Sequence, residues 1–381
     1  MKKIITIVGA RPQIIKAAAI SRAIRNSFSS DLEEVILHTG QHYDEKMSGD
    51  FFSELEIPKP LYNLQVRSSL QGGQTGKMLE GIEEILLKEK PDALLVYGDT
   101  NSTIAGALAA VKLHVPVIHI EAGLRSYKKF MPEEINRIVT DHSSTLLFSP
   151  TQAGIDNLSN EGFDVNYRGE FSADKPGVFH CGDIMLDNSL YFSSKTDGVA
   201  LEKFDLEKNK YFLVTIHRPQ NTDNTERLAS ILNTLMSIAD EEDCMMVLPL
   251  HPRTNKVLTE HYPELWSDLL ESPSVRVIPP ASYLEMMDME RNAWFIATDS
   301  GGVQKEAYFF NKPSLILRSE TEWVEICNDN NALLVDADPD KIYNGVNWMK
   351  NEMNTTFAPY FGDGKAGEFI VGKIIEFLKG V

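Results

Sequence analysis

The chain contains few of the residues that build disulfide frameworks and no membrane-spanning run. Only three of its 381 residues are cysteine (Cys181, Cys244 and Cys327), and they have no CxxC spacing. We therefore expect neither a disulfide framework nor a cysteine zinc site, and we expect a cytoplasmic protein. No run approaches the roughly 18 apolar residues of a membrane helix, so no membrane insertion is expected. The apolar run after "MKK" is too short for a signal peptide and predicts a first β-strand.

Positive charge is also scarce. The 37 Lys and Arg residues face 55 Asp and Glu residues, which gives a formal net charge of −18. Such a surface repels nucleic acid and anionic membranes, so no nucleic-acid partner is expected. A small anionic ligand would need a local pocket of Arg, Lys and backbone N–H groups.

Three well-known motifs are missing. The absence of HExxH disfavours a metal site, and the absence of a Walker A pattern disfavours a P-loop. The absence of GxSxG disfavours acyl chemistry. We expect no metal and no cofactor.

Short apolar runs alternate with helical patterns along the whole chain. In the first part these runs are 3–9, 34–40, 92–99, 115–123 and 145–150; in the second they are 211–217, 244–251, 275–280, 293–302, 313–318 and 331–336. The alternation predicts an α/β protein with two Rossmann-like, doubly wound domains facing across a cleft that holds the ligand. We expect residues 1–170 plus the helix at 365–381 to form the first domain and 171–364 the second, with the polar stretch 164–180 as the crossing.

The stretch "TDSGGVQKEA" (298–307) joins a strand to a helix through two glycines. Ser300, Gly301 and Gly302 would place N–H groups of the first helical turn around a phosphate, and Glu306 lies near enough to accept hydrogen bonds from a ribose diol. A plain turn with glycine chosen for positive φ explains the same letters. "GARPQIIKA" (9–17) similarly places Arg11 and Lys16 at a helix start, where they could face an anion or only solvent.

Acidic and basic side chains follow two neighbouring predicted strands and the next helix. They are Asp99, Glu121, Arg125, Glu133, Glu134, Arg137, Asp141 and His142. Because the carboxyl ends of parallel strands share one edge of a sheet, these groups should converge, and grouped acids can divide acid and base roles. Any one of them could instead be a helix cap.

Two further strand ends carry charge in the second half. His217 and Arg218 in "VTIHRPQ" fit a diphosphate contact or a general acid, and His251 with Arg253 repeats the idea more weakly. Arg318, followed by Glu320 and Glu322, either contacts a sugar or lies in a charged surface loop.

Taken in order, these motifs resemble a known family. "GARPQIIK", "GQHYDEKM", "GDTNST", "HIEAGLRS", "PEEINR", "HR" and "TDSGGVQKEA", with "ETEW" and "YGDGKAG", are similar to those of the non-hydrolysing UDP-N-acetylglucosamine 2-epimerases, from about residue 3 to 378. The resemblance implies the two-domain fold of one class of glycosyltransferases (GT-B type), an isomerase activity, a homodimer, a UDP-sugar as substrate and no cofactor. It also implies a role in making surface-polysaccharide precursors.

The resemblance implies inversion at C2 by anti elimination of UDP, a 2-acetamidoglucal intermediate and re-addition of UDP, converting UDP-N-acetylglucosamine to its manno epimer. The implied catalytic residues are Asp99, Glu121, Glu133 and His217. The implied substrate contacts are Arg11, Lys16, Arg137, Arg218, Ser300, Gly301, Gly302, Glu306 and Arg318. Some members bind a second substrate molecule, for which Gln41, His42 and Glu134 are candidates here.

Departures from the common family pattern leave the sugar open. Gln13, Gln220 and "ETEW" stand where Glu, Glu and Thr-Glu-Arg-Pro-Glu are more frequent, as in the branch acting on UDP-2,3-diacetamido-2,3-dideoxy-glucuronate. Replacing a carboxylate by Gln13 would relieve repulsion of a uronate. A glycosyltransferase of the same fold, a hydrolysing relative and a non-catalytic nucleotide-sugar binder are the remaining alternatives.

Overall fold

A computed structural model describes residues 1–41, 51–67, 70–196, 198–352 and 356–380. The chain divides into two compact units: unit 1 comprises Met1–Asn188 and Pro359–Val381, and unit 2 comprises Ser189–Ala358. The boundary falls inside helix α7 (Ile184–Ser193).

Unit 1 is built on a seven-stranded parallel sheet in the order β3-β2-β1-β4-β5-β6-β7. Its strands are β1 (Lys2–Val8), β2 (Leu32–His38), β3 (Tyr62–Asn63), β4 (Ala93–Tyr97), β5 (Val117–Ile120), β6 (Leu146–Ser149) and β7 (Gly177–His180). The central strands are buried on both faces, as their near-continuous Ile, Leu and Val content predicts.

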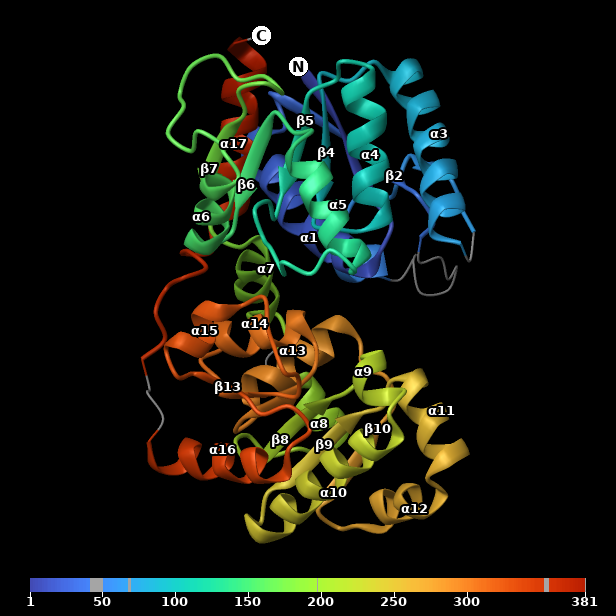
Figure 1. The fold of residues 1–381 in the computed structure, drawn as a ribbon, viewed down its shortest axis with the longest axis vertical. Helices are drawn as coiled ribbons and strands as arrows, with labels where there is room; N and C mark the ends of the chain where they lie inside the picture. The colour runs from blue at the N-terminus through green and yellow to red at the C-terminus, as the bar shows by residue number, and fades with distance from the viewer. Residues whose placement is uncertain (42–50, 68–69, 197, 353–355, 381) are drawn as a thin grey trace. The chain divides into compact units, whose positions relative to one another are not determined.

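Helices cover this sheet. They are α1 (Arg11–Ala23), the π-helix η1 (Ile24–Phe28), α3 (Gln71–Glu89), α4 (Asn101–Lys112), α5 (Pro132–Asp141), α6 (Gln152–Asn160) and α17 (Ala366–Gly380). Helix α17, the red C-terminal helix of Figure 1, packs against α1. It is anchored by Asp187, whose carboxylate accepts hydrogen bonds from the N–H groups of Ala366 (3.2 Å) and Gly367 (2.7 Å).

Unit 2 contains a six-stranded parallel sheet in the order β10-β9-β8-β11-β12-β13. Its strands are β8 (Tyr211–Thr215), β9 (Met245–Pro249), β10 (Val275–Ile278), β11 (Ile296–Thr298), β12 (Ser314–Ile316) and β13 (Ala332–Leu334). Its helices are α8 (Val199–Phe204), α9 (Pro219–Thr222), α10 (Thr225–Glu241), α11 (Pro252–His261), α12 (Pro263–Glu271), α13 (Tyr283–Asn292), α14 (Gly301–Phe309), α15 (Val324–Asn328) and α16 (Pro339–Asn351).

The predicted fold class is confirmed: both units are doubly wound α/β. Two strands were not predicted. β3 is a two-residue edge strand, and β7 lies at the end of the polar stretch 164–180 that we expected to cross between domains. Because β7 pairs with β6, the compact part of unit 1 continues past residue 170, to Asn188.

The strand orders locate the functional edges. In unit 1 the chain winds one way from β1 to β3 and the other way from β4 to β7, so the switch lies between β1 and β4. In unit 2 the corresponding switch lies between β8 and β11. Ligands of open α/β sheets bind beyond the carboxyl ends of the strands at such points.

Candidate functional site

The turn between β1 and α1 in unit 1 is organised by Gln13. Its side-chain oxygen accepts hydrogen bonds from the N–H groups of Gly9 (2.9 Å) and Ala10 (3.1 Å). Its amide nitrogen donates to the carbonyl of Tyr97 (3.1 Å) and the hydroxyl of Thr103 (3.0 Å). Gln13 is 1% exposed, and its side chain ties the ends of β1 and β4 together. Its effect on a uronate substrate stays a prediction.

Lys16 and Glu121 meet at the same edge of the sheet. The Lys16 ammonium and the Glu121 carboxylate form an ion pair, and each side chain is largely buried. Glu121 has a φ of +73°, an uncommon conformation for a residue with a side chain. Gly98, with a φ of +60°, lies beside the pair: a Cβ added there would be 3.3 Å from both charged atoms. The strained backbone and missing side chain therefore leave room for this ion pair.

Asp99 is held by Arg137 from helix α5. The Arg137 guanidinium lies 2.6 Å from Asp99 Oδ2 and 2.9 Å from Glu134 Oε2. The Asp99 side chain keeps 29% of its surface exposed, whereas that of Glu134 keeps 1%. Glu133, its neighbour on α5, is exposed. The two adjacent glutamates therefore have different environments.

Glu134 binds the loop that precedes α5. Its carboxylate accepts hydrogen bonds from the N–H groups of Ser126 (2.9 Å) and Tyr127 (2.8 Å) and from the Ser126 hydroxyl (3.0 Å). Burial raises the pKa of Glu134, but these donors and Arg137 outweigh it, so the net pKa is lowered. The carboxylate is thus committed to contacts within unit 1.

The other candidates of unit 1 lie around the first helix and the loop after β2. The guanidinium of Arg11 lies 4.8 Å from the centre of the Phe51 ring. Gln41 Oε1 accepts hydrogen bonds from the N–H (3.2 Å) and hydroxyl (2.7 Å) of Ser102. His42 lies outside the described residues.

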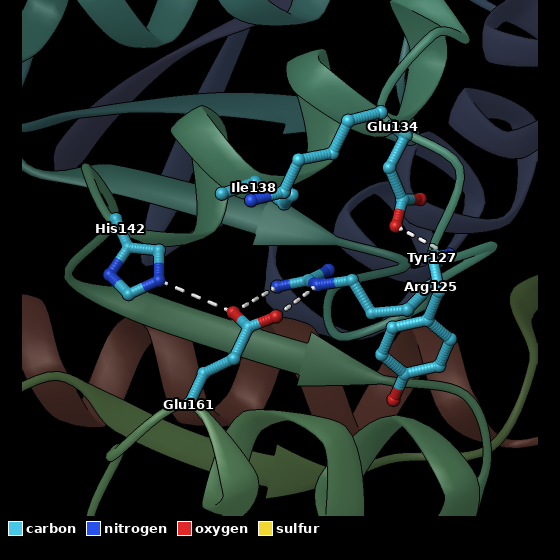
Figure 2. A pocket seen from close by; sticks show the side chains of 7 residues that line it. Arg125, Tyr127, Glu134, Ile138, His142 and Glu161 are labelled. Carbon is cyan, nitrogen blue, oxygen red and sulfur yellow. Dashed lines mark hydrogen bonds and ion pairs between the residues drawn. The ribbon is translucent and has the colours of Figure 1, made fainter.

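A cavity of about 580 Å³ opens between α5, α6 and the loop before α5. It is lined by Arg125, Tyr127, Lys129, Glu134, Ile138, His142 and Glu161 (Figure 2). Glu161 accepts hydrogen bonds from Arg125 at 2.6 and 2.7 Å and lies 3.2 Å from His142. Arg125 also lies 2.7 Å from Asp141, so Arg125, Asp141 and His142, which the sequence grouped with the site acids, form a charge network with Glu161.

In unit 2, His217 follows β8 and is held by Asp299, which follows β11. Asp299 is fully buried, and its carboxylate accepts hydrogen bonds from the N–H groups of His217 (3.1 Å) and Arg218 (3.0 Å) and from the Asn221 amide (3.1 Å). His217 Nδ1 lies 3.2 Å from Asp299 Oδ1. Burial raises the pKa of Asp299, but His217 and the backbone donors lower it by more, so the net pKa lies below the usual value. The Asp299 carboxylate therefore orients the His217 imidazole.

Arg218 and Arg318 share one carboxylate. Glu322 lies 2.9 Å from Arg318 and 3.9 Å from Arg218, and its side chain is 19% exposed. Burial raises the pKa of Glu322, and the two arginines together with its own backbone N–H bring it below the usual range. The Glu322 side chain is thus largely buried between two arginines, and a sugar contact by this segment stays a prediction.

Gly301 and Gly302 begin helix α14, with Ser300 as its N-cap. Neither glycine has a positive φ, so the explanation that glycine was chosen here for positive φ is wrong. A Cβ at Gly301 would lie 2.6 Å from Glu322 Oε1, whereas a Cβ at Gly302 would approach only the Ser300 hydroxyl, at 3.8 Å. A side chain at Gly301 would therefore force the Glu322 carboxylate away from the helix start.

Glu306, one turn into α14, is 6% exposed and lies near a second acid, Glu290 of α13. Glu290 is fully buried, and neither of its oxygens has a hydrogen-bond partner among the residues the structure describes. Burial, and then the charge of Glu306, raise the pKa of Glu290 well above its usual value. Burial therefore favours the neutral form of the Glu290 carboxyl.

The weaker pair of the sequence, His251 and Arg253, has local roles. His251 Nδ1 accepts a hydrogen bond from Arg253 N–H (3.2 Å) and caps helix α11, and the His251 ring centre lies 5.5 Å from that of His217. Arg253 pairs with exposed Asp223 at 2.5 and 2.7 Å.

Sequence reasoning missed the supporting roles of Gln13 and Asp299. Asp299 stands inside the quoted "TDSGG" motif at a strand end, which was the available signal. Gln13 was noted only as a departure from the family pattern, because a buried hydrogen bond to a distant carbonyl leaves no trace in spacing.

Within the described part of the chain, no helix is long and apolar enough to span a membrane. In the same part, no group of three or more His, Cys, Asp or Glu side chains is arranged to hold a metal ion.

Two Rossmann-like units with polar side chains at both topological switch points define a GT-B-type α/β protein. The family model described as UDP-N-acetylglucosamine 2-epimerase matches residues 25–376. The chain is 40% identical to a UDP-GlcNAc 2-epimerase of Methanocaldococcus jannaschii solved with UDP-GlcNAc and UDP, with a TM-score of 0.85 over 98% of this chain and 99% of that one.

Two curated relatives are closer in sequence. A UDP-N-acetylglucosamine 2-epimerase homolog of Methanococcus maripaludis is 47% identical over 99% of both chains. The UDP-2,3-diacetamido-2,3-dideoxy-D-glucuronate 2-epimerase of Pseudomonas aeruginosa is 46% identical, again over 99% of each. The chain therefore belongs to the UDP-N-acetylglucosamine 2-epimerase family, whose members are isomerases.

Proposed function

We propose that the protein inverts C2 of a UDP-2-acetamido sugar, converting UDP-N-acetylglucosamine to UDP-N-acetylmannosamine. The observation that carries this proposal is the set of differently paired carboxylates at the switch point of unit 1: Asp99 held by Arg137, and Glu121 held by Lys16. Family membership supplies the reaction class.

In the proposed reaction a carboxylate removes the C2 proton, and the C1–O bond to UDP breaks on the opposite face. This yields a 2-acetamidoglucal and UDP, and UDP adds back after a proton returns to the other face of C2. The C2 proton is weakly acidic, so departure of UDP needs strong electrostatic stabilisation. Asp99, Glu121 and exposed Glu133 are the proposed acid and base groups.

We assign the nucleotide to unit 2. His217 and Arg218 would contact the diphosphate, with Arg318 beside them. The N–H groups after Ser300 would bind phosphate, and buried Glu306 would accept the ribose hydroxyls. Asp299 and Glu322 support this assignment because they hold the His217 imidazole and the two guanidiniums in place. In unit 1, Arg11, Lys16 and Arg137 would contact the sugar and phosphate.

A second candidate substrate is UDP-2,3-diacetamido-2,3-dideoxy-glucuronate, favoured by the 46% identical relative with that name. We further propose that a second substrate molecule binds at Gln41, His42 and Glu134. We also propose that the protein is a homodimer, lies in the cytoplasm and serves surface-polysaccharide synthesis. Light scattering of the pure protein tests the dimer.

The test is incubation of the pure protein with each UDP-sugar in D₂O, followed by NMR. Epimerisation predicts deuterium at C2 with the UDP linkage retained. Free sugar would instead indicate hydrolysis, and absence of exchange would favour a transferase or a binder. Asp99→Asn should abolish exchange while UDP binding stays nearly intact, and Asp174→Asn, at an exposed position, is the matched control. Exchange that survives Asp99→Asn would refute the role of Asp99.

A further inference from the structure

His119, on β5 of unit 1, is completely buried and has an acceptor at each ring nitrogen. Nδ1 lies 2.6 Å from Asp141 Oδ1, and Nε2 lies 2.8 Å from the carbonyl oxygen of Gly98. Because the Gly98 carbonyl can only accept, Nε2 donates to it. The ring is thus held at both nitrogens.

Asp141, at the end of α5, contacts His119, Gly123 and Arg125. Its Oδ1 faces His119, while Oδ2 accepts a hydrogen bond from Gly123 N–H (3.1 Å) and lies 2.7 Å from Arg125. Burial raises the pKa of Asp141, but His119 and Arg125 together bring it below its usual range. Arg125 in turn binds Glu161 at the cavity of Figure 2. The buried charges are thus all paired, as their burial requires.

The two backbone groups held by this network adjoin the proposed acid and base residues. The Gly98 carbonyl immediately precedes Asp99, and the Gly123 amide lies two residues after Glu121. All three of Gly98, Glu121 and Gly123 have positive φ, at +60°, +73° and +82°. Glycine adopts positive φ readily, but for Glu121, which has a side chain, this conformation persists only where surrounding contacts hold it. A shift of Gly98 would also disturb the Lys16–Glu121 pair packed beside it.

We propose that His119 is a positioning residue for Asp99 and Glu121: its Nε2–H holds the Gly98 carbonyl, while its partner Asp141 holds the Gly123 amide. This inference rests on the proposed function, because it assigns His119 a role through those two carboxylates. His119 touches neither substrate nor the reacting atoms. It acts by holding two loops in a geometry that neither would keep alone.

Two substitutions separate the two hydrogen bonds of the ring. The amide nitrogen of asparagine is as far along the side chain as Nδ1, so His119→Asn keeps the donor to Asp141 and loses the donor to Gly98. The amide nitrogen of glutamine matches Nε2, so His119→Gln keeps the donor to Gly98. His142→Gln is the control, since His142 also pairs with a carboxylate of the network but is 49% exposed and contacts neither glycine.

In the C2 exchange assay we expect His119→Asn to lower kcat by about 10- to 100-fold with KM and UDP affinity changed by less than about threefold, because small misplacements of reacting groups have such effects. His119→Gln should keep at least about fivefold more kcat than His119→Asn, and His142→Gln should match the wild type. Equal losses in the two His119 variants, or a His119→Asn rate equal to that of the control, would overturn the proposal.

Hydrogen exchange of the Gly98 amide gives a readout independent of activity. This amide donates to the Ile120 carbonyl at 3.0 Å, and it should exchange faster in His119→Asn but not in His119→Gln. If the wild type epimerises no UDP-sugar, the proposed function fails, and this exchange still decides the positioning role. If His119→Asn does not fold, His119→Gln decides instead. It keeps a donor for the Gly98 carbonyl, so a folded His119→Gln protein whose Gly98 amide exchanges faster than that of the wild type overturns the role.

Discussion

The adjacent residues Glu133 and Glu134 provide the sharpest test of how burial divides roles in unit 1. Glu134→Gln preserves shape but removes a charge that accepts three hydrogen bonds and pairs with Arg137. Hydrogen bonds to charged groups contribute about 1.5–3 kcal/mol each, and the amide can replace only some of them. We therefore expect a loss of about 3 kcal/mol in the free energy of unfolding of unit 1. Glu133→Gln, on the exposed side of the same turn, should change it by less than about 0.5 kcal/mol.

The pH dependence follows from the lowered pKa of Glu134. A group whose pKa is depressed by folding stabilises the protein above its unfolded pKa, and that stability is lost as pH falls through the folded pKa. The difference between wild type and Glu134→Gln should therefore be full at pH 7 and shrink below the ordinary value of 4.5. Thermal unfolding at pH 7 and pH 4 measures it, and about 3 kcal/mol corresponds to roughly 6–12 °C for a unit of this size.

Glu133 should affect activity and not stability, the opposite of Glu134. Glu133→Gln should lower C2 exchange by about 100-fold or more while the melting temperature is unchanged, as expected for a general acid or base. Two results would refute this reasoning: a Glu134→Gln protein as stable as the wild type at pH 7, or an undiminished exchange rate in Glu133→Gln.

Three further changes have defined outcomes. Gly98→Ala imposes a positive φ on a residue with a side chain, which costs about 1–2 kcal/mol, and the new methyl group crowds Glu121. Thermal unfolding should show this loss of stability, and the C2 exchange assay should show a lower kcat. Wild-type values in both assays would contradict this reasoning. Asp299→Asn removes the charge that orients His217, so calorimetry should show UDP binding weakened by about tenfold or more, equivalent to about 1.4 kcal/mol; unchanged affinity would dissociate Asp299 from the nucleotide. Folding raises the pKa of Glu290, so its contribution to stability is full below its unfolded pKa and is lost as pH rises. Glu290→Gln should therefore be more stable than the wild type by about 1–3 kcal/mol at pH 8 and by less at pH 5. Urea unfolding at the two pH values measures this difference.

Much of the fold was predictable because parallel strands buried on both faces form continuous apolar runs. All six strands of unit 2 were predicted from such runs, as were β1, β2, β4, β5 and β6 of unit 1. β3 escaped because two residues carry no periodicity, and β7 because Gly177–His180 follows a long polar stretch. The helix whose start was predicted within 9–17 is α1, and it continues as the π-helix η1 from Ile24, a change of hydrogen bonding that no residue type predicts.

For the site, the sequence by itself determined which charged residues follow the strand ends, since strand and helix boundaries depend on local composition. Only the tertiary structure decided how those residues divide. At the switch point Asp99 pairs with Arg137, and Glu121 pairs with Lys16. Glu134 is bound by the loop before α5, and Asp141 and Arg125 join His119 in a buried network. The physical reason is that burial and hydrogen-bond partners come from segments far apart in the chain, so adjacent letters such as Glu133 and Glu134 can have opposite environments.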